Sequence, residues 1–242
     1  MRKNISQLAM AMVLFFGFAP FAVLADEYKA TLAQMPVYVI SETEGVIVDL
    51  VKAIERMTEN QIAIGVYPFA RSMLNVIKKR ADFHIPLIKN DIIPEEKLPY
   101  YYSAETIFHV NFVLYTVKES GVTLNNISQY KVETDRAHVD YFPFEMIPSS
   151  KIIQSLKKLH VGRIDAFVFS DVATDPILRK LGYTEIQRIP YKRFEVKIIL
   201  PKTEHGKQVD RMLSDAIQEL RKSGKLKEIL GTVDQPYDNW QP

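Results

Sequence analysis

The sequence predicts an α/β protein built in two halves. Two alternating series of strands and helices follow one another, and a long stretch of alternating character at 107–117 separates them. Strands that alternate with helices are typical of a parallel sheet covered by helices. A strand of about eleven residues is roughly twice the usual length, so 107–117 is predicted to run from one half into the other.

In the first half, helical and strand periods alternate clearly. The predicted elements are strands 28–33, 62–66 and 83–87 and helices 45–58 and 68–80. Ile47, Leu50, Val51, Ile54 and Met57 recur at helical spacing, which indicates one buried stripe. The second helix is predicted to end in three basic residues at 78–80, which suit the negative end of its dipole.

The second half repeats this pattern after the long strand. In 107–117, Phe108, Val110, Phe112 and Leu114 share one face. The later predicted elements are strands 130–134, 164–169 and 194–200, helices 151–160, 176–181 and 205–223, and a short final helix. The apolar strand 194–200 is a candidate for the return crossing into the first half.

The N-terminus reads as a secretory signal. Basic residues at 2 and 3 precede an uncharged run from 8 to 25, which closes on Ala25 before Asp26. We expect cleavage after Ala25 and a periplasmic protein of 217 residues from the 242 in the sequence. The alternative is an uncleaved anchor, because the run approaches the roughly twenty residues that span a bilayer. Pro20 and the small residues before the cut favour cleavage.

Composition excludes several classes of protein. The chain has no cysteine, so we expect no disulfide, no thiolate metal site and no lipid-bearing cysteine. Without Arg2 and Lys3, 29 basic residues balance 29 acidic ones. A nucleic-acid partner is therefore not expected, because such proteins usually carry a basic excess.

Three stretches together resemble one protein family. They are 45–54 (GVIVDLVKAI), 67–82 (opening YPFAR and closing AD) and 156–167 (LKKLHVGRIDAF). In this order and spacing they resemble the polar-amino-acid (family 3) type of periplasmic solute-binding proteins, which serve ABC transporters. The ending 222–230 (KSGKLKEIL) is similar to the family's closing helices.

The resemblance implies a two-lobed periplasmic-binding-protein fold of type II with two crossing hinge strands. It would assign 1–25 to the signal peptide, 26–115 and 200–242 to lobe 1, and 116–199 to lobe 2. The family holds its ligand in the cleft and closes the lobes by hinge motion. We therefore expect a monomeric binding protein for a small polar, carboxylate-bearing ligand, with a membrane permease or sensor as partner and no cofactor or metal.

By the same resemblance, Phe69 takes the place of the aromatic residue on which the ligand stacks, with Tyr38 and Tyr67 nearby. Arg71 follows in the same turn, and its guanidinium could hold a carboxylate through two hydrogen bonds. The alternatives are that Phe69 belongs to the core and that Arg71 is an exposed first-turn residue.

The sequence departs from the family's amino-acid site. The segment 93–97 (IPEEK) lacks the arginine that usually holds the carboxylate, and Lys89 is a reserve cation. Ser170 stands where the family places the acid for the ligand's ammonium group, with Asp171 one place later. Arg136 and His138 lie in the stretch that replaces the anion loop, and Tyr102 lies at the expected base of the cleft.

Two other functions remain open at this stage. An enzyme on the same scaffold could use His138, Glu133 or Asp135 as an acid or base, but the sequence carries no catalytic motif and we do not expect an enzyme. A ligand sensor that signals to a membrane partner would show the same features. Fold alone does not distinguish these functions.

Overall fold

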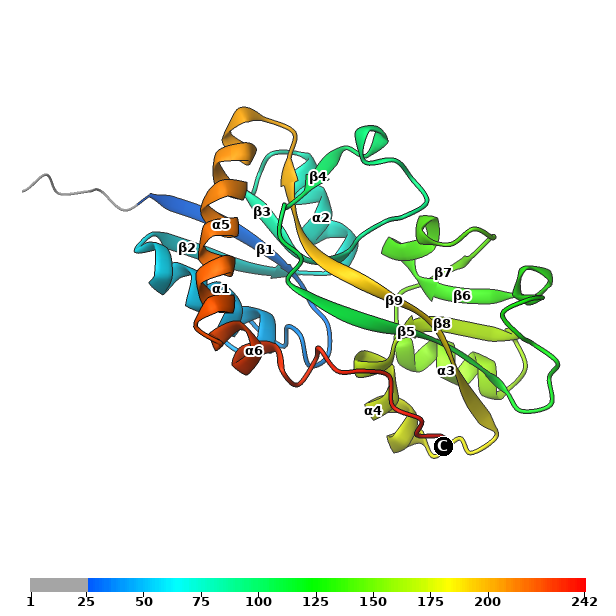
Figure 1. The fold of residues 1–242 in the computed structure, drawn as a ribbon. Helices are drawn as coiled ribbons and strands as arrows, with labels where there is room; N and C mark the ends of the chain where they lie inside the picture. Colours follow the sequence, from blue (N-terminus) through cyan, green and yellow to red (C-terminus); the bar gives the residue numbers. More distant parts are fainter. Residues whose placement is uncertain (1–25) are drawn as a thin grey trace, which may run out of the picture.

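A computed structural model describes residues 26–242, and the predicted signal at 1–25 lies outside the described residues. The chain forms an α/β structure around one sheet in the order β2-β1-β3-β9-β5-β8-β6-β7, with β4 added beside β9. Figure 1 shows two bodies of helices and strands joined by the long ribbons of β5 and β9. We call the body with β1 to β4 lobe 1 and the body with β6 to β8 lobe 2.

The strands are β1 Glu27–Ala33, β2 Gln61–Tyr67, β3 Phe83–Ile88, β4 Tyr100–Tyr102, β5 Phe108–Val117, β6 Val132–Asp135, β7 Ile147–Ser149, β8 Ala166–Ser170 and β9 Ile186–Pro201. The α-helices are α1 Val46–Thr58, α2 Phe69–Ile77, α3 Ile152–His160, α4 Asp171–Leu181, α5 Glu204–Lys222 and α6 Lys225–Leu230. None of the helices between 26 and 242 is both long and apolar enough to cross a membrane.

Lobe 1 has helices on both faces of its strands. On one side α1 packs against α5 and α6, and on the other α2 packs against β1 and β3. The predicted stripe of α1 is buried at Ile47, Leu50, Val51 and Ile54, whereas Met57 is exposed. The apolar period therefore predicted the buried face correctly except at Met57 in the last turn.

Lobe 2 is an insertion between β5 and β9. Its strands β6, β7 and β8 are parallel to one another, with α3 and α4 packed against β8. The helix predicted at 176–181 begins earlier, at Asp171, directly after β8. Pro176 lies inside this helix at its sixth position and does not open it.

The two hinge strands pair with each other along their whole shared length. β5 and β9 run antiparallel from Phe108 opposite Val196 to Val117 opposite Ile186. β9 is 16 residues long and begins well before the predicted return strand at 194. A register shift between Phe112 and Val113 leaves Tyr191 as an extra residue on β9, and such a bulge bends a strand locally.

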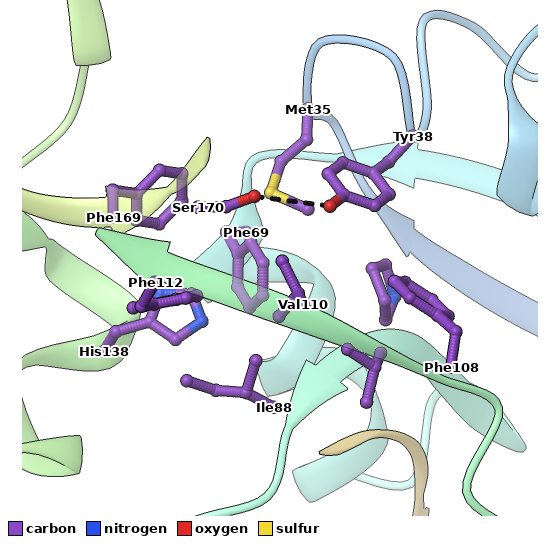
Figure 2. Close-up of a pocket in the computed structure, with 12 residues that line it drawn as sticks. Met35, Tyr38, Phe69, Ile88, Phe108, Val110, Phe112, His138, Phe169 and Ser170 are labelled. Carbon is purple, nitrogen blue, oxygen red and sulfur yellow. Dashed lines mark hydrogen bonds between the residues drawn. The ribbon is translucent and has the colours of Figure 1, made fainter. Parts of the chain in front are cut away.

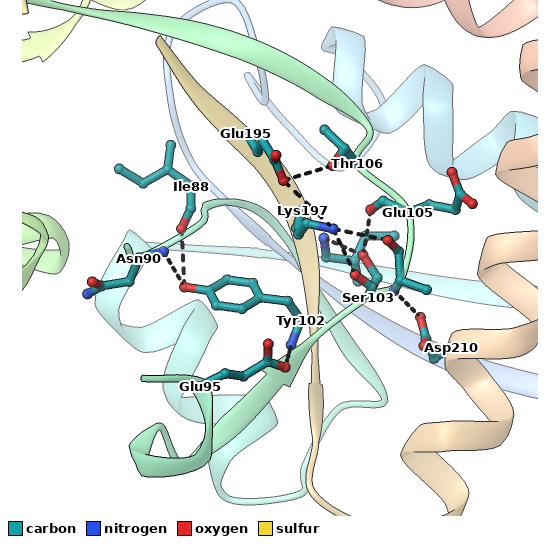
Figure 3. A network of polar contacts seen from close by, with 12 residues as sticks. Ile88, Asn90, Glu95, Tyr102, Ser103, Glu105, Thr106, Glu195, Lys197 and Asp210 are labelled. Atoms are coloured by element: carbon teal, nitrogen blue, oxygen red, sulfur yellow. Dashed lines mark hydrogen bonds and ion pairs between the residues drawn. The ribbon is translucent and has the colours of Figure 1, made fainter. Parts of the chain in front are cut away.

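A buried lysine fixes the lobe 1 end of the hinge. Lys197 of β9 donates to the carbonyls of Ser103 at 3.2 Å and Ala104 at 3.0 Å, and its ammonium lies 4.0 Å from Glu195 (Figure 3). Burial lowers the pKa of this ammonium. The backbone N–H of Ala104 in turn donates to Asp210 of α5. The network thus ties the segment before β5 to β9 and to α5.

The last residues cross from lobe 1 to lobe 2, and we call residues 234–242 the C-terminal strap (Figure 1). The strap closes over Arg188 of β9, which is 3% exposed. The Arg188 guanidinium pairs with Asp175 of α4 at 2.6 Å and with Asp238 of the strap at 2.9 Å. It also bonds the carbonyl of Trp240, whose ring stacks on Arg179 with the guanidinium 3.4 Å from the ring centre. The strap is therefore anchored by the buried Arg188 guanidinium, which also pairs with Asp175 of lobe 2.

Candidate functional site

A small cavity lies between the lobes, where β5 and β9 cross. Its volume is about 30 Å³, which is room for roughly one water molecule. The lining residues, all drawn in Figure 2, are Met35, Tyr38, Phe69, Pro86, Ile88, Phe108, Val110, Phe112, His138, Phe169, Ser170 and Val196. Both lobes and both hinge strands contribute, so any movement of the hinge changes the shape of the cavity.

Aromatic side chains surround His138 on the lobe 2 side of the cavity. Its ring centre lies 4.8 Å from that of Phe69, 5.7 Å from Phe112 and 5.7 Å from Phe169, each at a steep angle. Figure 2 shows His138 beside Phe112, with Phe69 behind them. His138 is 2% exposed, and its Nδ1 atom lies 3.6 Å from the Asp135 carboxylate, beyond hydrogen-bond reach. A lobe 2 side chain therefore packs against the Phe69 ring, which the resemblance assigned to the ligand.

The other polar groups at the cavity are two hydroxyls. Tyr38 Oη of lobe 1 and Ser170 Oγ of lobe 2 lie 3.3 Å apart and form a hydrogen bond between the lobes. Burial raises the pKa of Tyr38 well above its ordinary value, so the phenol stays neutral. Among the described residues, none of those that line this cavity is Asp, Glu, Lys or Arg.

Further hydrogen bonds join the lobes beside the cavity. Asn90, just after β3, donates to the carbonyl of Asp140 at 3.0 Å. Tyr141 Oη lies 3.3 Å from Tyr100 Oη and 3.5 Å from Tyr102 Oη. Asp140 and Tyr141 belong to the 3₁₀ helix Arg136–Tyr141, which also carries His138. This one segment of lobe 2 therefore supplies most of the polar contacts to lobe 1 around the cavity.

The structure brings together four of the ten residues that the sequence suggested for the site. Tyr38, Phe69, His138 and Ser170 line the cavity. Tyr102 lies beside it, where its hydroxyl accepts from the Asn90 N–H at 3.0 Å. Tyr102 therefore supports the wall and does not itself line the cavity.

The other five lie elsewhere. Arg71 and Tyr67 line a groove on the outside of lobe 1, Arg136 is exposed, and Lys89 is half-buried beyond the end of β3. The Asp171 carboxylate accepts from Asn111 at 3.0 Å and lines a separate groove beneath the strap. The expected anion contact of Arg71 has a geometric obstacle, since residues two apart on a helix face different directions and Phe69 points into the cavity.

The sequence interpretation did not assign the apolar lining to the site. Phe108, Val110 and Phe112 alternate on β5, and Phe169 precedes Ser170 on β8. The signal was present, because the predicted alternation placed three of these residues on one face of a predicted hinge strand. A face of a hinge strand that passes between two lobes necessarily borders their cleft.

Comparison with known proteins gives a clear result at the level of fold. No protein-family model matches the sequence, and no curated protein matches it. Solved structures do match. The ligand-binding core of GluR0 from Nostoc punctiforme, in complex with L-glutamate, superposes with a TM-score of 0.69 at 16% identity, over 86% of this chain and 100% of that chain.

Two further structures show the same likeness. ArtJ from Geobacillus stearothermophilus, an arginine-, lysine- and histidine-binding protein, has a TM-score of 0.69 at 16% identity over 90% of this chain and 96% of its own. A histidine kinase sensor domain described as similar to periplasmic binding proteins has a TM-score of 0.69 at 14% identity, over 90% and 99%. This chain has the periplasmic-binding-protein fold. The two-lobed fold that the sequence predicted is confirmed.

Proposed function

We propose that the protein is a periplasmic binding protein that captures a small uncharged ligand, with a ring or another apolar body, between its two lobes. The lining of the inter-lobe cavity carries this proposal. Phe69, Phe112 and Phe169 dominate it, and no Asp, Glu, Lys or Arg is among its lining residues. An isolated carboxylate or ammonium buried there would lose its hydration without a charged partner, at a cost of several kcal/mol.

The polar groups of the cavity would orient such a ligand. The hydroxyls of Tyr38 and Ser170 and the imidazole of His138 offer a few hydrogen-bonding atoms in an otherwise apolar wall. Binding sites commonly combine an apolar lining with a small number of placed polar groups. A ligand with one amide, hydroxyl or ring nitrogen would satisfy this set, whereas an α-amino acid would leave both of its charges unpaired.

Entry of the ligand requires the lobes to separate. A volume of about 30 Å³ does not admit a ring, and His138 packs on Phe69. Opening of the hinge formed by β5 and β9 would withdraw His138 together with lobe 2. The ligand would then bind to Phe69, and closure would exclude water from it.

The ligand-bound protein would bind to a membrane partner, either a permease or a sensor. Export rests on the predicted signal at 1–25. Binding is favoured over catalysis because His138 is held among aromatic rings and has no hydrogen-bonded acid to orient it. A partner that distinguishes open from closed lobes needs no chemical step from this chain.

Thermal-shift measurements on the purified protein test this function. The probes are indole and benzamide as uncharged ring compounds and L-glutamate and L-arginine as charged amino acids. We expect the ring compounds to raise the melting temperature, because a ligand at a hundredfold excess over its Kd stabilises the folded state by about 2.7 kcal/mol. The charged amino acids should have no effect.

Two variants check that the response comes from the cavity. Phe69→Ala removes the stacking face, whereas Phe144→Ala removes a ring in lobe 2 outside the cavity. The first should abolish the shift and the second should keep it. A melting temperature that rises with L-glutamate or L-arginine and not with the ring compounds would overturn the proposal.

A further inference from the structure

A second, unrelated feature of lobe 1 is a groove on its outer surface beside β2, with a volume of about 410 Å³. Its floor contains the small residues Ala63 and Gly65 of β2. One wall carries Arg71 of α2 and Arg80, which lies just after the end of this helix. The Tyr67 ring lies over Gly65, where a Cβ atom would come within 2.8 Å of it. Glycine thus allows the ring to lie across the strand, and Arg71 lies over that ring at 5.3 Å from its centre.

β2 is an edge strand of the sheet. It pairs only with β1, at one end of the strand order, and its 7 residues QIAIGVY carry no charge and no proline (Figure 1). In the parallel register Gln61 donates to Asp26 and Tyr67 accepts from Gln34, so the odd-numbered residues bond toward β1. The backbone groups of Ile62, Ile64 and Val66 therefore point outward.

Most of this outward edge is free. Glu55 of α1 accepts from the Ile62 N–H at 2.9 Å and occupies one position. In the described chain, the backbone N–H groups of Ile64 and Val66 bond to no side chain or loop. Natural proteins usually protect an edge of this length with charges or a covering segment, because free edges pair with other chains.

The cations beside the edge are also unpaired. Lys29, Arg71 and Arg80 all line the groove, and within residues 26–242 none of them forms a salt bridge. The nearby Asp82 carboxylate is held by the Lys29 backbone N–H and by His205. The groove therefore presents positive charge along a strand that has free hydrogen-bonding groups.

We propose that this groove binds an extended acidic segment of a partner protein, which adds to the sheet as a strand beside β2. The backbone of the segment would bond to Ile64 and Val66, and its acidic side chains would meet Lys29, Arg71 and Arg80. Strand addition draws affinity from main-chain hydrogen bonds and specificity from alternate side chains. Side chains on one face of a strand recur about every 6.6–6.8 Å, so the segment should carry acidic residues at alternate positions. This inference does not depend on the ligand between the lobes.

Fluorescence anisotropy of a labelled peptide tests the inference directly. The probe alternates glutamate with valine and has the length of β2, 7 residues. A matched peptide replaces glutamate with lysine. We expect the purified protein to bind the glutamate peptide and not the lysine peptide, and hydrogen exchange at the amides of Ile64 and Val66 should slow when it binds.

Two variants separate the contributions of charge and backbone. R71E/R80E should weaken binding at least tenfold, and Ile64→Pro should abolish it, because proline removes an outward N–H without removing a bond to β1. Arg56→Glu reverses one charge on α1 outside the groove and should bind normally. Thermal melting of each variant confirms that it is folded.

Several outcomes would overturn the inference. Binding that persists in Ile64→Pro would show charge attraction without strand addition. A dimer of the protein itself that is lost in Ile64→Pro would assign the edge to a second copy. Binding to anionic phosphatidylglycerol vesicles but not to the peptide would assign the groove to a membrane surface. If the glutamate peptide does not bind at millimolar concentration, the groove does not bind an acidic strand.

Discussion

Two buried residues, His84 and Lys197, lead to predictions about how the stability of this protein depends on pH and on substitution. His84 of β3 is fully buried, with Nδ1 2.7 Å from Ser72 Oγ, and its Nε2 atom has no partner among the described residues. Burial lowers the pKa of His84 from its ordinary value of 6.5 to about 3. The imidazole of the folded protein is therefore neutral above about pH 3.

This buried histidine predicts a loss of stability in acid. Between pH 6.5 and about 3 the unfolded chain binds a proton at His84 that the folded chain excludes. The free energy of unfolding should therefore fall by up to about 1.4 kcal/mol per pH unit as the pH drops through this window, and its full value should be present above 6.5. Urea unfolding at several pH values should show a flatter dependence in His84→Gln. His109→Gln, at a half-buried position of β5, is the matched control variant.

Lys197 gives a second prediction at this scale. Replacement by methionine keeps the apolar stem and leaves the carbonyls of Ser103 and Ala104 without their donor. We expect Lys197→Met to lower the free energy of unfolding by about 1–3 kcal/mol, the usual cost of a buried unpaired polar group. Lys225→Met, on the exposed face of α6, should change it by less than about 0.5 kcal/mol. Equal midpoints for the two variants in urea would show that burial of the ammonium costs as much as its hydrogen bonds contribute.

The residues of the site show where prediction from sequence stops. Phe69 and Ser170 were suggested by the family resemblance, and both line the cavity. Arg71 could not be assigned to the cavity by the same argument, since the rotation of α2 about its axis directs Phe69 inward and Arg71 outward. His138 was suggested from its loop alone, and its packing on Phe69 depends on how the lobes meet, which is a long-range property.

Among the elements, the C-terminal strap contributes most that the local sequence does not reveal. The periodicity of α1, α3 and α5 predicted these helices to within one or two residues. The strap has no helical or strand periodicity of apolar residues. Its structure depends on contacts with Arg188, some fifty residues earlier in the chain. The length of β9 was underestimated for a related reason, because its first half is held by pairing with β5 and is not a continuous apolar run.

Removal of the Arg188 charge, on which the strap is anchored, should loosen the strap. Arg188→Met leaves Asp175 buried with only the Tyr115 hydroxyl as partner and frees Asp238. Loss of one partner of a buried ion pair typically costs about 3–5 kcal/mol, so we expect a large fall in the urea midpoint. Hydrogen exchange should become faster in 234–242 and in α4. Arg163→Met, which changes an exposed arginine of lobe 2, is the control. If Arg188→Met and this control have the same urea midpoint, Arg188 does not anchor the strap.

At the scale of the whole molecule, the hydrogen bonds between the lobes determine how far the lobes stay closed. Asn90 and Tyr141 make such bonds beside the cavity. Asn90 makes one such bond and Tyr141 two, and each contributes about 0.5–1.5 kcal/mol net. The loss of all three should therefore shift the ratio of closed to open molecules by roughly tenfold to two-thousandfold.

Small-angle scattering measures this shift. The double variant Asn90→Ala/Tyr141→Phe should have a larger radius of gyration than the parent protein. Asn126→Ala removes side-chain bonds that lie entirely within lobe 2 and should not change the radius. An unchanged radius in the double variant would mean that the remaining contacts, which are the aromatic packing, the Tyr38–Ser170 bond and the strap, are enough to hold the lobes together.

The insertion of lobe 2 between β5 and β9 also has a consequence for the order in which the chain can fold as it is synthesised. β3 and β5 each need β9 as a neighbour, and β9 begins at Ile186, about a hundred residues after the end of β3. At a synthesis rate of about 5–20 residues per second, these two strands therefore have an unpaired edge for several seconds, until β9 is synthesised. Lobe 2 has no such delay, since β6, β7 and β8 follow one another directly. Lobe 1, which begins first along the chain, is therefore completed last. We expect the nascent chain to be most prone to aggregation in the interval before β9 is synthesised.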